Sequence, residues 1–189
     1  MTASQAFSPK SSPDIELRQL KFSVAKASMQ NPLGFDALFI PDSYASVLRS
    51  LPALKNLGMD KLLFLGTNAW NDPALAAKSL GLLNNSVFLD IYFKNADSPV
   101  AQEFVRQYQA AYAQEPSTLE AMGYDAVKFL GQALAGQKPK SAQDVARAML
   151  SVHDFQGVTG LRAFQSSREA KVDPYLLTVV GDKISEVKK

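Results

Sequence analysis

The hydrophobic positions in the first half of the chain alternate between short apolar runs and longer helical patterns. Apolar runs at residues 35–40, 62–65 and 87–92 are typical of strands buried in a parallel sheet. Residues 43–57 instead place their apolar side chains on one side of a predicted helix. These side chains are Val47, Leu48, Leu51, Leu54 and Leu57. Pro52 lies inside this helix and is expected to bend it or break it in two.

Two further helices complete the alternating pattern. Residues 15–30 and residues 73–80 both have helical spacing of their apolar positions. The apolar face of the first of these helices consists of Leu17, Leu20, Val24 and Ala27. Residues 1–14 are rich in Ser, Ala and Pro without any period, which indicates a flexible lead-in. This order of strands and helices predicts an α/β fold with a parallel sheet.

Polar loops directly follow the first two predicted strands. Residues 41–44, Pro-Asp-Ser-Tyr, follow the first strand, and residues 66–72, Gly-Thr-Asn-Ala-Trp-Asn-Asp, follow the second. In open α/β sheets, ligands bind in the crevice outside the carboxyl ends of the strands, and parallel strands bring both loops to that edge. The hydroxyl, amide, carboxylate and aromatic groups of these loops suit holding a small polar molecule better than transforming one.

The second half of the chain is more helical. We predict one helix capped at Ser98, a second that starts at Ser117, and a third over residues 141–150. The second of these is expected to bury Met122, Val127, Leu130 and Leu134. Residues 157–164 indicate a turn and a short strand, and residues 175–187 indicate a β-hairpin.

Three parallel strands provide too little sheet for this number of helices. A parallel sheet is covered by helices on both faces, and the helices after Pro99 have no predicted strand left to cover. Either these helices pack on one another, or the missing strands belong to a larger architecture. We expect the chain to be marginally stable unless it dimerises, because an apolar helix face would otherwise be exposed.

Composition narrows the class of protein. The 189 residues include 20 basic and 18 acidic side chains without a concentrated basic patch, which argues against a nucleic-acid partner. No apolar run approaches the ~20 residues that cross a bilayer, and the start of the sequence lacks the apolar core of an export signal. The absence of cysteine excludes disulfides, thiolate metal sites and cysteine nucleophiles.

The sequence contains no catalytic constellation. His153 is the only histidine and follows a predicted helix end, where a surface or capping role is expected. Asp42 and Asp72 would need a fixed separation and opposed pKa environments for acid–base catalysis, and Asp72 is more simply a helix cap. Asp125 is expected to face solvent. Nucleophile-elbow, zinc-protease, phosphate-loop and dinucleotide-binding motifs are all absent. We therefore expect a protein that is not an enzyme and needs no cofactor or metal.

A series of short motifs, in this order, resembles a known family over most of the chain, from about Leu17 to the end. The motifs are residues 41–44, Leu-Gly-Thr-Asn at 65–68, Val-Phe-Leu-Asp at 87–90, Glu-Ala-Met-Gly-Tyr-Asp-Ala at 120–126 and Gly-Val-Thr-Gly at 157–160. Together they resemble the C-terminal half of a type I periplasmic binding protein. More narrowly, they resemble the leucine-binding, or branched-chain amino acid receptor, family.

Two segments are most similar to one branch of that fold. Residues 66–73, GTNAWNDP, and residues 155–164, FQGVTGLRAF, resemble the penicillin-binding protein activators. Members of this branch are outer-membrane lipoproteins that stimulate peptidoglycan synthases.

The resemblance implies a two-lobed architecture of which the chain holds only part. The family has two α/β lobes joined by three crossing strands, with the ligand between them. Residues 15–92 and 157–189 would form the second lobe, and the helical residues 93–156 would belong to the first lobe, whose sheet comes from a preceding half. The implied fold is a type I periplasmic-binding-protein-like three-layer parallel sheet, present in part. A fragment, a split gene product or a truncated protein is expected, with a periplasmic location.

Five residues of the strand-end loops are candidate ligand contacts: Asp42, Ser43, Tyr44, Asn68 and Trp70. The resemblance implies that Tyr44, next to Ser43, faces the ligand. Alternatively, Ser43 is only a helix cap and Tyr44 an aromatic residue at the rim. Trp70, the single tryptophan, either stacks on a ligand or partner or packs between its loop and the neighbouring helix.

Asn68 departs from the family pattern. The resemblance implies an acidic residue here that pairs with the α-ammonium group of an amino acid. An amide can accept a hydrogen bond from that group but cannot neutralise its charge, and an unpaired buried charge is costly. Asn68 therefore argues against a standard amino-acid ligand.

Two functions remain open. The first is a non-catalytic solute-binding receptor of an ABC transporter, which captures a small polar ligand between two lobes and passes it to a membrane permease. The second is a penicillin-binding protein activator-like regulator, which uses the same fold to contact a peptidoglycan synthase. A homodimer or a missing N-terminal half would complete the molecule in either case.

Overall fold

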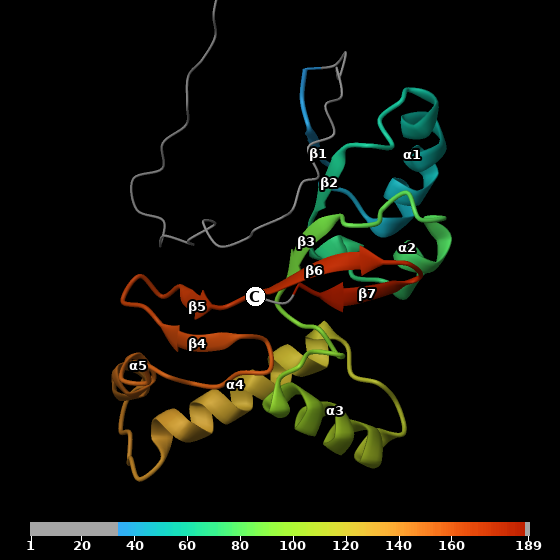
Figure 1. Cartoon of the computed structure of the whole chain (residues 1–189). Helices are drawn as coiled ribbons and strands as arrows, with labels where there is room; N and C mark the ends of the chain where they lie inside the picture. Colours follow the sequence, from blue (N-terminus) through green and yellow to red (C-terminus); the bar gives the residue numbers. More distant parts are fainter. Residues whose placement is uncertain (1–33, 188–189) are drawn as a thin grey trace, which may run out of the picture.

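The computed structural model describes residues 34–187 of the chain (Figure 1). The predicted lead-in over residues 1–14 and the predicted helix over residues 15–30 lie outside the described residues. Within residues 34–187, the strands and helices follow the predicted order.

A five-stranded sheet organises the first part and the end of the described chain. Its strands are β1 (Ala37–Phe39), β2 (Leu63–Gly66), β3 (Val87–Asp90), β6 (Tyr175–Val180) and β7 (Lys183–Glu186), hydrogen-bonded in the order β1-β2-β3-β6-β7. Strands β1, β2 and β3 are parallel, whereas β6 is antiparallel to both β3 and β7. The predicted α/β class is confirmed, with the difference that the C-terminal hairpin makes the sheet mixed.

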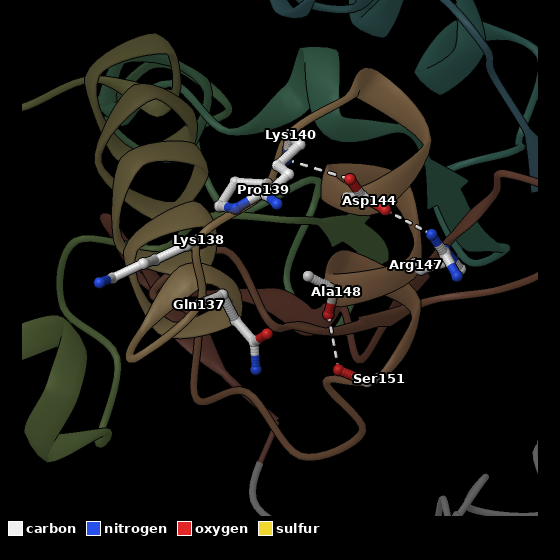
Figure 2. Close-up of a pocket in the computed structure, with 8 residues that line it drawn as sticks. All are labelled: Gln137, Lys138, Pro139, Lys140, Asp144, Arg147, Ala148 and Ser151. Atoms are coloured by element: carbon white, nitrogen blue, oxygen red, sulfur yellow. Dashed lines mark hydrogen bonds and ion pairs between the residues drawn. The ribbon is translucent and has the colours of Figure 1, made fainter.

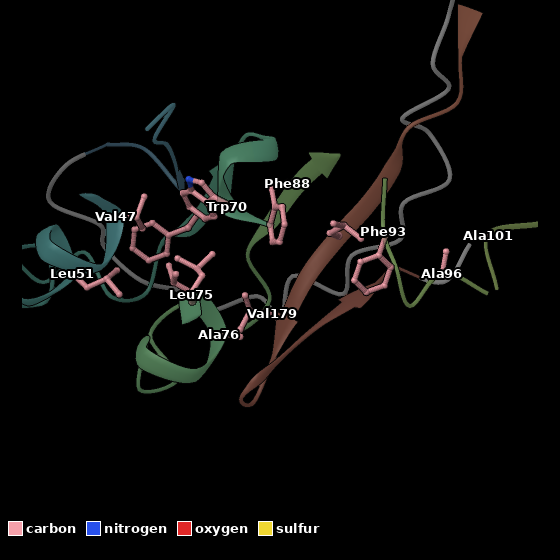
Figure 3. Close-up of a cluster of buried hydrophobic side chains, with 13 residues drawn as sticks. Val47, Leu51, Trp70, Leu75, Ala76, Phe88, Phe93, Ala96, Ala101 and Val179 are labelled. Carbon is pink, nitrogen blue, oxygen red and sulfur yellow. The ribbon is translucent and has the colours of Figure 1, made fainter. Parts of the chain in front are cut away.

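Helices α1 (Tyr44–Asn56) and α2 (Pro73–Lys78) pack on one face of this sheet (Figure 1). The main core cluster begins between these helices and the sheet and continues into the connection after β3 and the start of α3 (Figure 3). It consists of Val47, Leu51, Phe64, Trp70, Leu75, Ala76, Leu83, Phe88, Phe93, Ala96, Ala101, Leu177 and Val179. Alternate strand residues point to the other face, where Phe39 is 55% exposed and Leu89 is 46% exposed. The described residues therefore form two of the three predicted layers.

Helix α1 continues unbroken through Pro52, so of the expected bend or break, the break was wrong. Proline removes one backbone donor and crowds the preceding turn. Val47 and Leu51, one turn apart on the core side of the helix, are both buried, whereas Pro52 is exposed. Packing of Val47 and Leu51 before the proline, and of the half-buried Leu54 after it, outweighs this local cost.

Three helices and a small sheet form the rest of the described residues. The helices are α3 (Pro99–Tyr112), α4 (Thr118–Leu134) and α5 (Ala142–Leu150), and the antiparallel strands are β4 (Leu161–Phe164) and β5 (Ala170–Val172). Phe129 of α4 contacts Phe155 and Phe164 edge-to-face, with ring centroids 5.1 and 5.0 Å apart. The β4–β5 pair therefore packs with the helices and stays outside the five-stranded sheet. The proposed division into lobes at residue 157 remains a prediction.

Helix α4 buries a different face from the predicted one. Its buried residues are spaced by four: Ala121, Asp125, Phe129 and Ala133. Met122, Val127 and Leu130 are 50, 72 and 40% exposed, so the prediction that they lie inside was wrong. The reason is that α4 is apolar on two sides, and periodicity alone cannot choose between them.

The buried carboxylate of Asp125 joins α4 to the segment that returns to the main sheet. It accepts hydrogen bonds from the backbone N–H groups of Val158 (2.9 Å) and Thr159 (2.8 Å) and from the Thr159 hydroxyl. A side chain at Gly157 would place its Cβ 2.6 Å from Asp125 Oδ2, so only glycine fits. The expectation that Asp125 faces solvent was wrong, because backbone donors 33 and 34 residues away satisfy it.

Candidate functional site

The candidate site lies where β1 and β2 end side by side. Phe39 pairs with Leu65 in the parallel ladder, and the N–H of Ile40 extends the ladder by donating to the Leu65 carbonyl at 2.9 Å. The loops that follow both strands leave from this carboxyl edge of the sheet. This is the edge at which open α/β sheets bind ligands.

The loop after β1 carries three of the candidate residues. Asp42 is exposed, and its Oδ1 accepts the N–H of Ser43 at 2.6 Å. The Oγ of Ser43 accepts the N–H of Ser46 at 3.4 Å and so caps α1. Tyr44 is half-buried and packs against the main core. The capping role of Ser43 is confirmed, and the roles of Asp42, Ser43 and Tyr44 in ligand binding remain predictions.

The loop after β2 presents Asn68 to solvent. Asn68 begins a short 3₁₀-helix, η2 (Asn68–Trp70), whose cap is Thr67. The Oγ1 of Thr67 accepts the N–H of Ala69 at 3.4 Å. Asn68 is exposed, so its amide is accessible to a molecule in the crevice.

Trp70 is completely buried in the main core (Figure 3). Its ring lies against Gly66, where a Cβ would be only 2.2 Å from the indole, and 5.9 Å from the ring centroid of Phe88. Its Nε1–H donates to the Ile40 carbonyl at 3.2 Å. Of the two interpretations of Trp70, the structure shows packing, and stacking on a ligand would require the ring to leave the core.

Two residues that the sequence analysis did not single out connect the β2 loop to the end of β3. The Nδ2 of Asn71 donates to Asp90 Oδ2 at 2.8 Å and to the Tyr92 carbonyl at 3.0 Å. The other oxygen of Asp90, Oδ1, accepts the N–H of Ile91 at 2.7 Å. A signal was present, since Asp90 directly ends an apolar strand and Asn71 lies in a polar strand-end loop.

Tyr92 and Tyr175 lie where the sheet meets the helical part. Burial raises the pKa of Tyr92 to about 12, with a smaller contribution from the nearby Glu115. Among the described residues, the buried hydroxyl of Tyr92 has no hydrogen-bond partner. Burial also raises the pKa of Tyr175, whose hydroxyl donates to the Val158 carbonyl at 3.2 Å. Both phenols therefore stay neutral across the physiological pH range.

A hollow in the described structure lies elsewhere, between the end of α4 and α5 (Figure 2). It has a volume of about 470 Å³ and is lined by Gln137, Lys138, Pro139, Lys140, Asp144, Arg147, Ala148 and Ser151. Asp144 pairs with Arg147 and accepts the backbone N–H of Lys140 at 3.0 Å. None of the five predicted contact residues lines this hollow.

Residues 34–187 contain no group of three or more His, Cys, Asp or Glu side chains that could hold a metal ion. None of the helices in this part of the chain is both long and apolar enough to cross a membrane.

Comparison with solved structures shows the same fold in bacterial binding proteins. A protein from Rhodospirillum rubrum described as a branched-chain amino acid ABC transporter aligns with a TM-score of 0.74 at 24% identity, over 80% of this chain and 44% of that one. LivJ from Streptococcus pneumoniae, a branched-chain amino acid transporter substrate-binding protein in complex with isoleucine, aligns with a TM-score of 0.59 at 25% identity, over 82% and 45%. A solute-binding protein of an ABC transporter from R. palustris, in complex with benzoate, gives 0.58 at 18% identity, over 82% and 43%.

The chain therefore spans less than half the length of these solved relatives. No curated protein matches the sequence. A family profile described as "Periplasmic binding protein" matches residues 14–183, which is most of the chain. The chain belongs to the periplasmic binding protein family, with the type I fold.

Proposed function

We propose that the chain forms one wall of a non-catalytic solute-binding receptor of the ABC-transporter type. The observation that carries this proposal is the pair of polar loops that leave the sheet together at the carboxyl ends of β1 and β2. Family membership and the similarity to transporter binding proteins support it. By analogy with these relatives, a membrane permease is the partner and the periplasm the location.

The ligand is a small polar molecule without a free ammonium group. Asn68 supports this choice, because an exposed amide at the end of β2 can exchange hydrogen bonds but supplies no negative charge. Solved proteins with this fold hold either isoleucine, which carries an ammonium group, or benzoate, which does not. We place this chain with the second kind. Asp42, Ser43 and Tyr44 are the proposed contacts from the facing loop.

We propose that the opposite wall of the crevice corresponds to the part of the relatives that this chain does not cover. The chain covers 44% of the Rhodospirillum rubrum relative. The outward side of α4 carries Leu119, Met122, Val127 and Leu130, all at least 40% exposed. An apolar stripe of this kind is typical of a surface that is covered in the complete molecule. We propose the missing lobe as the cover, on the same polypeptide or on a second one, with a second copy of the chain as the alternative.

A second function is supported by Asn68 and by the residues around it. A penicillin-binding protein activator-like regulator would use this fold to contact a peptidoglycan synthase, with the crevice empty. The loss of the acidic residue at position 68 agrees with a fold that no longer binds an amino acid. This alternative would make the molecule a lipoprotein of the outer membrane.

The deciding experiment is a ligand titration on the protein encoded by the complete gene. Benzoate, L-leucine and L-isoleucine are added separately while thermal unfolding and calorimetric binding are recorded. A true ligand at ~100 times its dissociation constant stabilises by about 2.7 kcal/mol and raises the Tm by about 5–10 °C. We expect benzoate or a related carboxylate to bind and the two amino acids to fail.

The matched variant is Asn68→Asp, which restores a negative charge without changing the side-chain size. We expect it to gain affinity for leucine and isoleucine by at least tenfold, because the carboxylate can pair with their ammonium group. If no small molecule binds either protein, and a purified peptidoglycan synthase does bind, the receptor function is wrong and the regulator is correct.

A further inference from the structure

We propose that Trp70 and Asn71 are positioning residues that hold the candidate binding loop from both sides. Their relevance to ligand binding rests on the proposed function, whereas their structural role stands on the geometry alone. Neither residue faces the crevice: Trp70 is completely buried and Asn71 is half-buried. Although adjacent in sequence, they reach in opposite directions along the sheet, Trp70 to the end of β1 and Asn71 to the end of β3.

On the β1 side, one carbonyl oxygen joins the two candidate loops. The Ile40 oxygen accepts the Nε1–H of Trp70 at 3.2 Å and the backbone N–H of Asp42 at 2.9 Å. Ile40 lies at the last position of the parallel ladder, where no further strand residue donates. The indole and the Asp42 amide therefore meet at the same acceptor, which fixes the β1 loop relative to the β2 loop.

We call the contact of Trp70 with the end of β1 the first arm and the contact of Asn71 with the end of β3 the second arm. The absence of a side chain at Gly66 makes room for the first arm. The indole fills the space where a Cβ at this position would sit, so the ring lies directly on the last residue of β2. Burial of an aromatic side chain of this size stabilises its position, and the polar end of the ring still finds a partner. The sheet edge and the loop are thus packed as one body.

On the β3 side, Asn71 uses both hydrogens of one amide nitrogen. It donates to Asp90 Oδ2 at 2.8 Å and to the Tyr92 carbonyl at 3.0 Å. Asp90 is itself buried and fixed by the N–H of Ile91. Residues 91–98 connect β3 to α3, so this arm ties the candidate loop to the connection between the sheet and the helical part.

The result is a preorganised turn that presents Asn68. The N–H of Trp70 donates to the Thr67 carbonyl, and the N–H of Asn71 donates to the Asn68 carbonyl, both at 3.0 Å. Between these bonds, Asn68 lies on the outer, exposed side of the turn, whereas Trp70 and Asn71 point inward. A loop that is ordered before binding avoids the entropy cost of ordering upon binding.

Hydrogen exchange of the full chain without ligand tests the two arms separately. Trp70→Phe keeps an aromatic ring but removes the indole donor, and Asn71→Ala removes the amide. We expect Trp70→Phe to accelerate exchange over residues 41–46 about 5–10-fold, the effect of losing about one hydrogen bond. Asn71→Ala should accelerate exchange over residues 90–93 by a similar factor and leave residues 41–46 nearly unchanged.

The matched control is Val179→Ala on β6, which truncates a completely buried side chain of the same core without touching either loop. It should lower the Tm without selectively accelerating either segment. The proposal is overturned if Trp70→Phe and Val179→Ala give the same exchange pattern, or if neither arm variant changes its own segment. Asn71 is not a member of the main core cluster, so Asn71→Ala still tests the contact with the end of β3 if Trp70→Phe does not fold.

Ligand affinity is a separate readout on the protein from the complete gene. Each arm variant should weaken binding of the ligand found by titration about 5–10-fold, although neither side chain contacts it. If the exchange results hold and no ligand is found, the proposed receptor function fails while the positioning role stands. Altered exchange with unaltered affinity for a confirmed ligand would overturn the role in binding.

Discussion

Helices α1 and α4 both begin at serine caps, yet only α1 turns its predicted apolar side to the core, with the exception of Leu57 at its end, which is 65% exposed. Helix α1 has one apolar side, and Val47 and Leu51 on that side lie in the core. Helix α4 has two apolar sides, and the one that includes Met122 and Val127 faces outward. The apolar side of α1 is buried within the chain itself. One apolar side of α4 is left exposed, which is typical of a surface that another part of a larger molecule covers. Three measurements test this difference between the two helices and the parts of the molecule around them.

The largest expected effect is a difference in stability between matched truncations in the two helices. Leu51→Ala in α1 removes a buried side chain and should lower the free energy of unfolding by about 2–5 kcal/mol. Leu130→Ala in α4, where the side chain is 40% exposed, should cost less than about 1 kcal/mol. Urea denaturation of the two variants measures both values. Equal losses would show that the outward side of α4 is buried in solution.

An intermediate effect is expected at Tyr92, between the sheet and the helices. Burial raises its folded-state pKa to about 12, above the ordinary value of 10. Tyr92 therefore ionises more easily in the unfolded chain, so the free energy of unfolding is unaffected by this ionisation below pH 10 and falls as the pH rises through 12, on the order of 2 kcal/mol. Tyr92→Phe should remove this alkaline loss and raise the stability at pH 7 by about 1 kcal/mol, because the buried hydroxyl has no partner among the described residues.

Stability as a function of pH between 8 and 12 checks this prediction for the wild-type protein and the variant. A variant that is less stable at pH 7 would indicate that the hydroxyl has a partner in the complete molecule. An unchanged alkaline profile would mean that another group causes the loss.

The smallest effect on stability is expected for charges on the outward side of α4. Val127→Glu should change the free energy of unfolding by less than about 0.5 kcal/mol, because the side chain is 72% exposed. The same change should reduce self-association, measured as the mass in light scattering as a function of concentration. Ala110→Glu, at an exposed position of α3, is the control and should leave the mass unchanged. A wild-type chain that is monomeric at all concentrations would contradict a second copy as the cover for α4.

The order of most elements was predictable from the sequence because each has its own hydrophobic period or is bounded by capping and turn residues. The C-terminal hairpin is the clearest example, since alternating residues on both sides of Gly181 and Asp182 predict β6 and β7, and the structure pairs Val180 with Lys183. Strand β5 was missed because its three residues, Ala-Lys-Val, have no strand pattern and depend on pairing with β4.

The candidate site was predictable in place but not in the roles of its residues. Parallel strands had to bring the two polar loops to one edge, and they do. The burial of Trp70 was not decided by its own loop, because it depends on the empty space at Gly66 and on an acceptor 30 residues away. Asp125 likewise depends on donors more than 30 residues distant. Contacts of this range are set by the fold and leave no local signal.

The burial of Trp70 also has a practical consequence. It is the only tryptophan of the 189 residues, and its ring nitrogen touches the end of β1 beneath the candidate loops. All indole fluorescence of this chain therefore arises at one point below the crevice. A ligand that shifts either loop should alter the wavelength or intensity of that emission, so the chain carries its own optical probe and requires no added label.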